Sequence, residues 1–322
     1  MRVLITGGAG FVGHHVCEHF LVNTDWELVL LDRLDFSGNL NRLAESEIIQ
    51  KHAKRCRFLF HDLRAPINET LKAQIGPIYQ VVHCAASTHV DRSITDPVSF
   101  VYDNVLGTAH ILEFARHASR ELMYLSTDEI FGVAPHGVAY KEGDPYNSRN
   151  PYSATKAGAE EFCVAYANTY GLPVTIIHCM NMFGERQSVE KFIPMCIKRI
   201  RGDEEILIHG DKKGVPGSRM YLHARNLADA MLFLIDRGKY GKYNVVGDEI
   251  SNLDLVFMIA DIMGKGPWTR HVDFHSARPG HDLRYALDGS KLAALGWRPP
   301  VDLCKSLEKT VEWTLAHPEW LA

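Results

Sequence analysis

The sequence lacks the features that mark membrane, secreted and nucleic-acid-binding proteins. None of its apolar runs reaches the roughly 18 residues that a helix needs to cross a bilayer. Met1 leads directly into the strand-like run Val3-Leu4-Ile5, which leaves no space for a signal peptide, so we expect a cytoplasmic protein. The formal net charge is only −4, and no long basic tract suggests nucleic acid as a partner.

Paired metal ligands are also missing. The seven cysteines are odd in number and scattered, and no two of them form a CxxC pair, which predicts free buried thiols in a reducing compartment. His14 and His15 are adjacent, so they cannot share one helix face as a metal-binding pair would. We therefore expect no metal site.

The first half of the chain alternates between short apolar runs and helical patterns. Strands are predicted at 2–6, 27–31, 56–60, 80–83, 122–126 and 174–178, and helices near 12–22, 68–75, 98–118 and 152–170. Strands that are apolar on both faces lie under helices on two sides. The pattern predicts an α/β fold with a doubly wound parallel sheet of the Rossmann type.

The alternation stops near residue 180. Helices are predicted near 191–201, 225–237, 252–263 and 303–316, between clusters of glycine and proline. We predict a dinucleotide-binding domain over residues 1–178, which also carries the catalytic residues, and a smaller α/β lobe over 179–322 that mainly binds the substrate.

A glycine-rich turn follows the first predicted strand and opens a helix. Gly7, Gly10 and Gly13 are spaced GxxGxxG, with Phe11 and Val12 at the start of the helix. Glycine lets the backbone bend sharply and approach a pyrophosphate, which the free N–H groups of the helix N-terminus then bind. The pattern predicts a dinucleotide site, although a purely structural turn is the alternative.

An acid ends the second predicted strand, where a ribose hydroxyl would be bound. Asp32 follows Gly13 by nineteen residues. Its carboxylate would repel a 2′-phosphate, so we expect NAD rather than NADP. The neighbouring Arg33 leaves NADP open as an alternative.

Two further segments follow strands on the same edge of the predicted sheet. Asp62-Leu63 could meet the adenine amino group, or Asp62 could cap the next helix. Ala85, Ala86 and Ser87 are small enough to let the backbone approach the cofactor, with a tight turn as the alternative.

Tyr152 and Lys156 form a YxxxK pair on a predicted helix with Pro151 in its first turn. Residues four apart lie on one helix face, so the phenol and the ammonium point the same way. A nearby cation favours phenolate over phenol, so we expect Lys156 to lower the pKa of Tyr152. Tyr152 could then accept a hydroxyl proton as hydride leaves the same carbon.

Together these motifs resemble the extended short-chain dehydrogenases/reductases, and most closely the dTDP-glucose 4,6-dehydratases and their UDP-sugar relatives. The similarity is loose but covers about 300 residues. The matching stretches are 7–13, 83–93 (HCAASTHVDRS), 104–108 (NVLGT), 126–132 (STDEIFG), 152–156, 190–194 (EKFIP), 278–286 (RPGHDLRYA), 295–297 and 310–313.

The resemblance implies a lyase with NAD as cofactor, acting in deoxysugar biosynthesis. Glu129 would be the base at C5 of a C4-oxidised hexose, Asp128 the acid at the departing C6 hydroxyl, and Thr127 a hydrogen-bond partner of the C4 oxygen. Tyr152 and Lys156 would also contact the cofactor. Two adjacent carboxyl groups can act as acid and base if their environments separate their pKa values. The alternative is that Asp128 and Glu129 only cap a loop.

The resemblance also implies a nucleotide-sugar substrate. Its binding residues would be Thr88, Asn181, Lys191, Arg219, Asn252, Arg278 and His281, each with an ordinary salt bridge or surface contact as the alternative. The sequence departs from the dTDP-glucose pattern at 181–187, at 210–221 and in the shorter stretch 132–152, all expected near the substrate. These departures leave the base and the hexose open.

Three readings therefore remain: a 4,6-dehydratase, a C4 epimerase or decarboxylase of the same superfamily, and a non-catalytic NAD-binding sensor or scaffold. The resemblance also implies a homodimer that pairs the helices near 98–118 and 152–170 in a four-helix bundle, with packing on the sheet of the same chain as the alternative.

Overall fold

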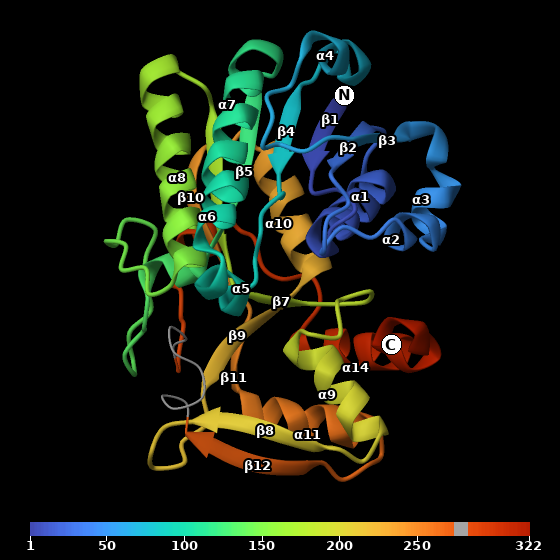
Figure 1. Cartoon of the computed structure of the whole chain (residues 1–322), viewed down its shortest axis with the longest axis vertical. Coiled ribbons are helices and arrows are strands. Elements are labelled where there is room, and N and C mark those ends of the chain that lie inside the picture. The colour runs from blue at the N-terminus through green and yellow to red at the C-terminus, as the bar shows by residue number, and fades with distance from the viewer. Residues whose placement is uncertain (274–282) are drawn as a thin grey trace.

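The computed structural model describes residues 1–273 and 283–322. A large sheet covered by helices forms the upper part of the molecule in Figure 1, and a smaller part with short sheets and helices lies below it.

The large sheet has seven strands in the order β10-β6-β5-β4-β1-β2-β3, and all its pairings are parallel. Its strands are β1 (Arg2–Thr6), β2 (Glu27–Asp32), β3 (Cys56–Phe60), β4 (Gln80–His83), β5 (Glu121–Thr127), β6 (Val174–Cys179) and β10 (Gly241–Val245). The strand order reverses between β1 and β4, and ligands of such sheets bind outside the strand ends at this reversal.

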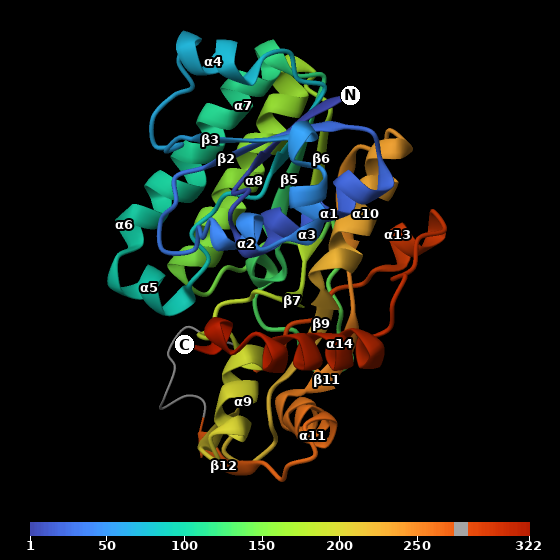
Figure 2. The same ribbon diagram turned by 90° about the vertical axis from the view of Figure 1, so that its right-hand side faces the viewer.

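Helices cover both faces of this sheet (Figures 1 and 2). One face carries α1 (Phe11–Asn23), α2 (Asn41–Ala44), α3 (Glu47–Lys51) and α10 (Ala224–Asp236). The other carries α4 (Glu69–Ile75), α5 (Val90–Thr95), α6 (Pro97–Phe100), α7 (Gly107–Ala118) and α8 (Pro151–Tyr170). A separate hydrophobic cluster fills each interface, with Val16, Phe20 and Met231 on the first face and Ile75 and Ile111 on the second.

The smaller part contains two further sheets. β7 (Asn181–Phe183), β9 (Ser218–His223) and β11 (Asp248–Ser251) form one, and β8 (Glu205–Gly210) pairs with β12 (Trp268–Asp273) in the other. Its helices are α9 (Phe192–Arg201), α11 (Asn252–Ile262) and α14 (Leu303–Ala316), and α13 (Ser290–Ala294) packs near β10. A third cluster, including Ile197, Leu255 and Leu307, holds these elements together.

The predicted doubly wound α/β fold is confirmed, as are the predicted strands of the first half. The second lobe is not continuous in sequence, however, because α10 packs on α1 and β10 becomes an edge strand of the large sheet. The short strands β7, β8, β9, β11 and β12 were not predicted. In the described residues, no helix has the length and apolar character of a membrane span. All seven cysteines are free thiols, but the prediction that they are buried is wrong for Cys304, which is exposed, and for Cys56 and Cys84, which are only partly buried.

Candidate active site

The glycine turn after β1 is built so tightly that side chains would not fit. Gly7 has φ +69°, and a Cβ there would lie 2.8 Å from the backbone N of Ala85. A Cβ on Gly13 would lie 2.1 Å from the carbonyl oxygen of Gly7. Helix α1 begins at Phe11 with Gly10 as N-cap and no side-chain cap. Its first N–H groups therefore suit a pyrophosphate, and the turn fits a dinucleotide.

Asp32 lies at the end of β2 beside this turn. One carboxylate oxygen accepts a hydrogen bond from the backbone N of Ala9 at 3.0 Å, and the other accepts from the backbone N of Leu34 at 2.8 Å. This places Asp32 next to the glycine turn, where an acid that accepts hydrogen bonds from the ribose hydroxyls is expected.

Arg33 is occupied by carboxylates. Its two Nη atoms donate to the two oxygens of Asp103 at 2.6 and 2.8 Å, and it also pairs with Asp35 and Asp62. Burial favours the neutral form of Asp103, but Arg33, Arg64 and Ser87 hold its pKa at about 2. An arginine paired with three carboxylates is poorly placed to bind a 2′-phosphate. This arrangement therefore favours NAD over NADP.

A π-helical segment, η2 (Val101–Leu106), joins α6 to α7. It carries Asp103 and Asn104, for which no role was predicted from the sequence. Ser87 Oγ donates to Asp103 at 2.6 Å, and the backbone N of Ser87 donates to Asn104 Oδ1 at 2.8 Å. Asn104 Nδ2 returns a bond to the Ser87 carbonyl at 3.0 Å. Such π segments occur often at functional sites, and this one fixes the segment Ala85–Ser87 beside Gly7.

Asp62 does not cap the helix that follows it. The N-cap of α4 is Asn68, whose Oδ1 accepts from the backbone N of Leu71 at 2.9 Å. Asp62 instead accepts from the backbone N of Arg64 at 2.9 Å, and Leu63 is buried in the core. The capping alternative is therefore wrong, and the adenine contact stays a prediction.

Thr127, Asp128 and Glu129 lie at the end of β5 and the start of the short helix η3 (Asp128–Phe131). Asp128 is 5% exposed, and Thr127 Oγ1 donates to its Oδ1 at 3.1 Å. Within the described residues, Asp128 Oδ2 is buried without a hydrogen-bond partner. Burial, together with the charge of Glu129, raises the pKa of Asp128 to about 7.

Glu129 has a different environment. Asn150 Nδ2 donates to its Oε2 at 3.2 Å. Asn150 is also the N-cap of α8, where its Oδ1 accepts from the backbone N of Ser153 at 2.8 Å. The helix start thus orients one of the two adjacent carboxyl groups, while burial acts on the other. The two adjacent carboxyl groups therefore lie in different environments.

Tyr152 and Lys156 lie four residues apart on α8, and both are buried. The expected lowering of the Tyr152 pKa is wrong: burial and the charge of Glu129 raise it well above its usual value, against a hydrogen bond to Thr127. Lys156 Nζ donates to the Leu125 carbonyl at 2.6 Å and lies 4.2 Å from the Tyr124 ring centre. Burial lowers the pKa of Lys156 to about 8.

Arg219 lies within electrostatic reach of Asp128. Its charge lowers the pKa of Asp128, against the larger effect of burial. Arg219 Nη1 donates to the Leu283 carbonyl at 2.6 Å. Tyr221 shares its face of β9 and donates a hydrogen bond of 3.0 Å to Asn252 Oδ1. The structure therefore brings two predicted substrate residues, Arg219 and Asn252, to one face of the small sheet.

The other predicted substrate residues are more dispersed. Thr88 is exposed after β4, and Asn181 is exposed at the start of β7. Lys191 precedes α9, and its charge acts with burial to lower the pKa of His89, which places it near Thr88. Arg278 and His281 lie outside the described residues.

One departure from the dTDP-glucose pattern has a structural role away from the predicted acids. Arg186 Nη1 pairs with Glu18 of α1 at 3.3 Å, and its guanidinium lies 5.0 Å from the Trp313 ring centre. Glu185 pairs with Arg225 of α10 at 2.6 Å. The side chains of residues 185 and 186 thus connect the two parts of the molecule, and the position of this segment near the substrate stays a prediction.

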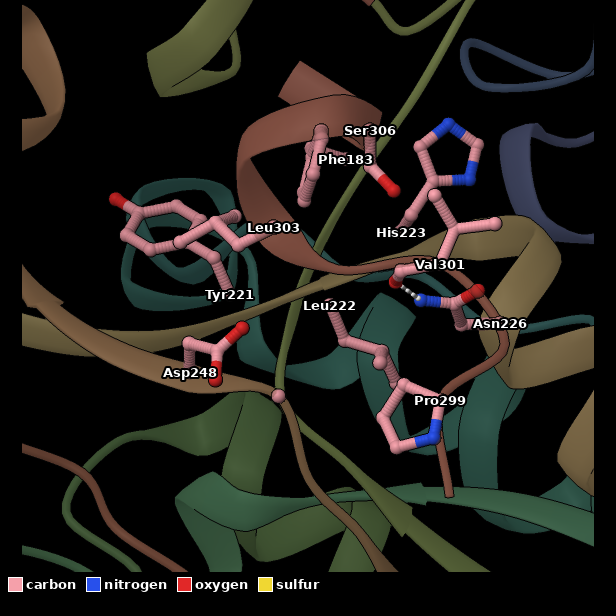
Figure 3. Close-up of a pocket in the computed structure, with 11 residues that line it drawn as sticks. Phe183, Tyr221, Leu222, His223, Asn226, Asp248, Pro299, Val301, Leu303 and Ser306 are labelled. Atoms are coloured by element: carbon pink, nitrogen blue, oxygen red, sulfur yellow. Dashed lines mark hydrogen bonds between the residues drawn. The ribbon is translucent and has the colours of Figure 1, made fainter. Parts of the chain in front are cut away.

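Figure 3 shows a cavity behind the small sheet, lined by residues of β9, α10 and α14. Its volume of about 10 Å³ holds no more than one water molecule. Asn226 Nδ2 donates to the Val301 carbonyl at 2.7 Å across its wall (Figure 3). This cavity is a packing feature and has no room for a sugar.

The sheet reversal and the glycine turn define a dinucleotide-binding enzyme of the Rossmann type, in which two adjacent acids, Asp128 and Glu129, lie at the end of β5. Residues 3–246 match the model of the NAD dependent epimerase/dehydratase family. The chain belongs to this family.

Relatives of both activities share the fold. A probable dTDP-glucose 4,6-dehydratase of Sinorhizobium fredii is 36% identical over 99% of this chain and 94% of its own. The crystal structure of the dTDP-glucose 4,6-dehydratase DesIV from Streptomyces venezuelae, with NAD and TYD bound, is 34% identical with a TM-score of 0.89, over 99% and 98% of the two chains. A UDP-glucose 4-epimerase of Thermus thermophilus with NAD is 28% identical with a TM-score of 0.87, over 97% and 98%.

Proposed function

We propose that the protein is an NAD-dependent nucleotide-sugar 4,6-dehydratase that converts a dTDP-hexose, with dTDP-glucose as the first candidate, to its 4-keto-6-deoxy form. The observation that carries this proposal is the Asp128–Glu129 pair, in which one buried carboxyl has a pKa of about 7 and its neighbour is held by Asn150. The two dehydratase relatives described above, at 36% and 34% identity, are more similar to this chain than the epimerase at 28%.

In this proposal Tyr152 accepts the proton of the C4 hydroxyl, and Thr127, already hydrogen-bonded to Tyr152, orients the same oxygen. Tyr152 must be a phenolate to accept this proton, although burial raises its pKa in the protein alone. The charge of Lys156, together with the positive nicotinamide ring that bound NAD would add, would stabilise that phenolate. The glycine turn, Asp32, Asp62, Leu63 and the segment 85–87 hold the cofactor. NAD, when bound, would supply the redox chemistry, by taking up hydride from C4 and giving it back at C6.

The elimination step then uses the two acids. A C4 ketone acidifies the C5 hydrogen, which Glu129 removes as a proton, while Asp128 protonates the departing C6 hydroxyl, which leaves as water. Glu129 then returns its proton to C5 as hydride is added at C6. A carboxyl with a pKa of about 7 is still partly protonated at neutral pH, so Asp128 can donate that proton. Arg219, Lys191 and Asn252 bind the nucleoside diphosphate, and Thr88 and Asn181 lie where the sugar would sit. The functional division near residue 178 remains part of this proposal.

The test is a product assay with dTDP-glucose and UDP-glucose as parallel donors. A dehydratase gives a 4-keto sugar that absorbs strongly in alkali, and an epimerase gives a hexose that does not. Conversion of dTDP-glucose to the 4-keto product supports the proposal. An epimer as the sole product, or NAD binding without turnover of either donor, contradicts it.

We further propose a homodimer through α7 and α8. Apolar side chains remain exposed on and near these helices: Val98, Val101, Tyr102, Phe162 and Tyr170. Exposed apolar patches of this kind mark protein interfaces. Light scattering on the purified protein should give the mass of two chains, and Phe162→Asp should give that of one. A monomeric wild-type protein would exclude this arrangement.

A further inference from the structure

A second buried carboxylate lies behind the acid–base pair. Glu160 of α8 is fully buried and accepts from Ser126 Oγ at 2.7 Å. His178 Nε2 lies 3.0 and 3.1 Å from its two oxygens, and Lys242 Nζ lies 3.0 Å from Oε1. The Tyr146 hydroxyl donates to the same carboxylate. Partners thus come from β5, β6, β10 and the loop that precedes α8.

These partners keep Glu160 ionised. Burial alone would favour the protonated acid, but the bonds to His178 and Tyr146 and the charge of Lys242 bring its pKa down to about 2. A buried carboxylate with several donors is a permanent anion at neutral pH. None of the proposed chemical steps uses this group.

Glu160 connects the two elements that carry the proposed chemistry. It lies one helical turn beyond Lys156, on the same face of α8. Ser126, which donates to it, directly precedes Thr127 on β5. The ring of Phe131, at the end of η3, contacts His178 with ring centres 5.1 Å apart. The Glu160 carboxylate therefore links α8, which carries Tyr152 and Lys156, to β5 and to η3, which carries Asp128 and Glu129.

Glu160 is also the anion that acts on Lys156. The groups whose negative charges raise the pKa of Lys156, against burial, are Cys179, Cys163, Cys84 and Glu160. Burial raises the pKa of the Cys84 and Cys179 thiols to about 12, and that of Cys163 also rises. The three thiols are therefore neutral at physiological pH, whereas Glu160 is charged.

The remaining titratable neighbours of Lys156 are neutral as well. Burial raises the pKa of the Tyr124 and Tyr152 phenols. Burial and the charge of Lys156 lower the pKa of His83 to about 3, so its imidazole carries no charge. Of the groups named here as acting on Lys156, Glu160 is thus the negatively charged one, and it pairs with Lys242 as well.

We propose that Glu160 is a positioning residue that holds Lys156 in its ammonium form and fixes the end of β5 from which Thr127, Asp128 and Glu129 extend. The effect of Glu160 on catalysis rests on the proposed function, whereas its effect on the charge of Lys156 can be measured without any substrate.

The first experiment follows Lys156 without substrate. The carbon-13 signal of its Cε, assigned by its loss in Lys156→Met, is titrated in the wild type, in Glu160→Gln and in the matched control Glu161→Gln, whose side chain is exposed on the same helix. The midpoint should fall by about one pH unit in Glu160→Gln and stay unchanged in Glu161→Gln. Equal midpoints in all three proteins would overturn the proposal.

Glu160→Gln leaves Lys242 without its carboxylate partner and could prevent folding. Circular dichroism checks each variant. If Glu160→Gln does not fold, Glu160→Met combined with Lys242→Met removes both charges together, an exchange that buried ion pairs often tolerate. A smaller fall in the Lys156 midpoint is expected, because the positive charge of Lys242 is removed together with the anion, and an unchanged midpoint again contradicts the proposal.

The second experiment follows C4 oxidation alone. In an Asp128→Asn background the elimination that follows is blocked, so the measured rate is that of hydride transfer from C4. Reduction of bound NAD is measured against pH with and without Glu160→Gln. Glu160→Gln should shift the alkaline limb of this pH–rate profile to lower pH, by the same amount as it shifts the Lys156 midpoint. The KM for dTDP-glucose should change less than about twofold, since Glu160 does not touch the substrate. A rise in KM with an unmoved limb contradicts the positioning role. A wild-type protein that turns over no sugar refutes the proposed function, while the titration still decides the role of Glu160.

Discussion

Asp128 and Glu160 are two carboxyl groups with almost the same burial and opposite surroundings. Asp128 is 5% exposed and Glu160 is 0% exposed. Asp128 accepts one side-chain hydrogen bond, from Thr127, and faces the charge of Glu129. Glu160 has four side-chain partners, two of them Lys242 and His178. The pKa values separate to about 7 and about 2.

The difference shows that the donors around a buried acid, more than burial itself, set its charge. A buried carboxyl group with few hydrogen-bond donors can exchange a proton near neutral pH, whereas one with several donors stays ionised. The two groups are connected through neighbouring residues of β5, because Ser126 donates to Glu160 and Thr127 donates to Asp128. Each prediction below tests one half of this contrast.

The largest expected effect is on turnover. Asp128→Asn keeps the shape of the side chain but removes its proton, so kcat should fall by about 10²- to 10⁴-fold, the usual contribution of a general acid. Asp25→Asn, an exposed substitution before β2, is the control and should leave kcat unchanged. Steady-state assays with dTDP-glucose measure both. Near-normal turnover in Asp128→Asn would mean that another group donates the proton.

Glu160→Gln should instead act mainly on stability. Breaking a buried ion pair on one side costs about 3 kcal/mol, because Lys242 loses its partner. The pKa of Glu160 is lowered in the folded state, so its stabilisation is present above the ordinary carboxyl pKa and is lost as pH falls toward 2. Urea unfolding at neutral pH measures the loss, with Glu161→Gln as the control. A loss no larger than that of the control would show that the network contributes little.

The sequence predicts one half of this contrast better than the other. The positions of Gly7, Tyr152 and Lys156 could be predicted because each motif depends on local geometry: a turn that needs positive φ, or a four-residue spacing on a helix. Asp128 and Glu129 were predicted through a resemblance, but the pKa of Asp128 depends on burial, which a motif does not encode.

The contacts around Glu160 and Asp103 could not be predicted from spacing. Lys242 is 82 residues from Glu160 in the chain, and it reaches the carboxylate only because β10 joins the edge of the large sheet. Arg33 and Asp103 are 70 residues apart and meet through a π segment that resembles an ordinary helix in sequence. The raised pKa of Tyr152 was missed for the same reason, since it depends on the packing of neighbouring acids around the ring.

The pH dependence of turnover should reveal the proton on Asp128. An acid must be protonated to donate, so kcat/KM should fall above the Asp128 pKa of about 7, by about tenfold for each pH unit. The limb near pH 7 should disappear in Asp128→Asn, and the alkaline limb that remains should reflect Lys156, whose pKa is about 8. A limb that stays near pH 7 in this variant would contradict its assignment to Asp128.

The smallest expected effect has the opposite sign to that of Glu160→Gln. Because the pKa of Asp128 is raised from 3.8 to about 7 in the folded state, the folded protein binds more protons than the unfolded chain between these values. Its stability should therefore fall as pH rises through this range. Asp128→Asn removes the buried charge and should stabilise the protein by about 1 to 2 kcal/mol above pH 7, with little effect near pH 4. Urea unfolding of both proteins at the two pH values measures the difference. If Asp128→Asn and Glu160→Gln both destabilise the fold at alkaline pH, the Asp128 carboxylate has partners as good as those of Glu160 and the contrast between the two acids fails.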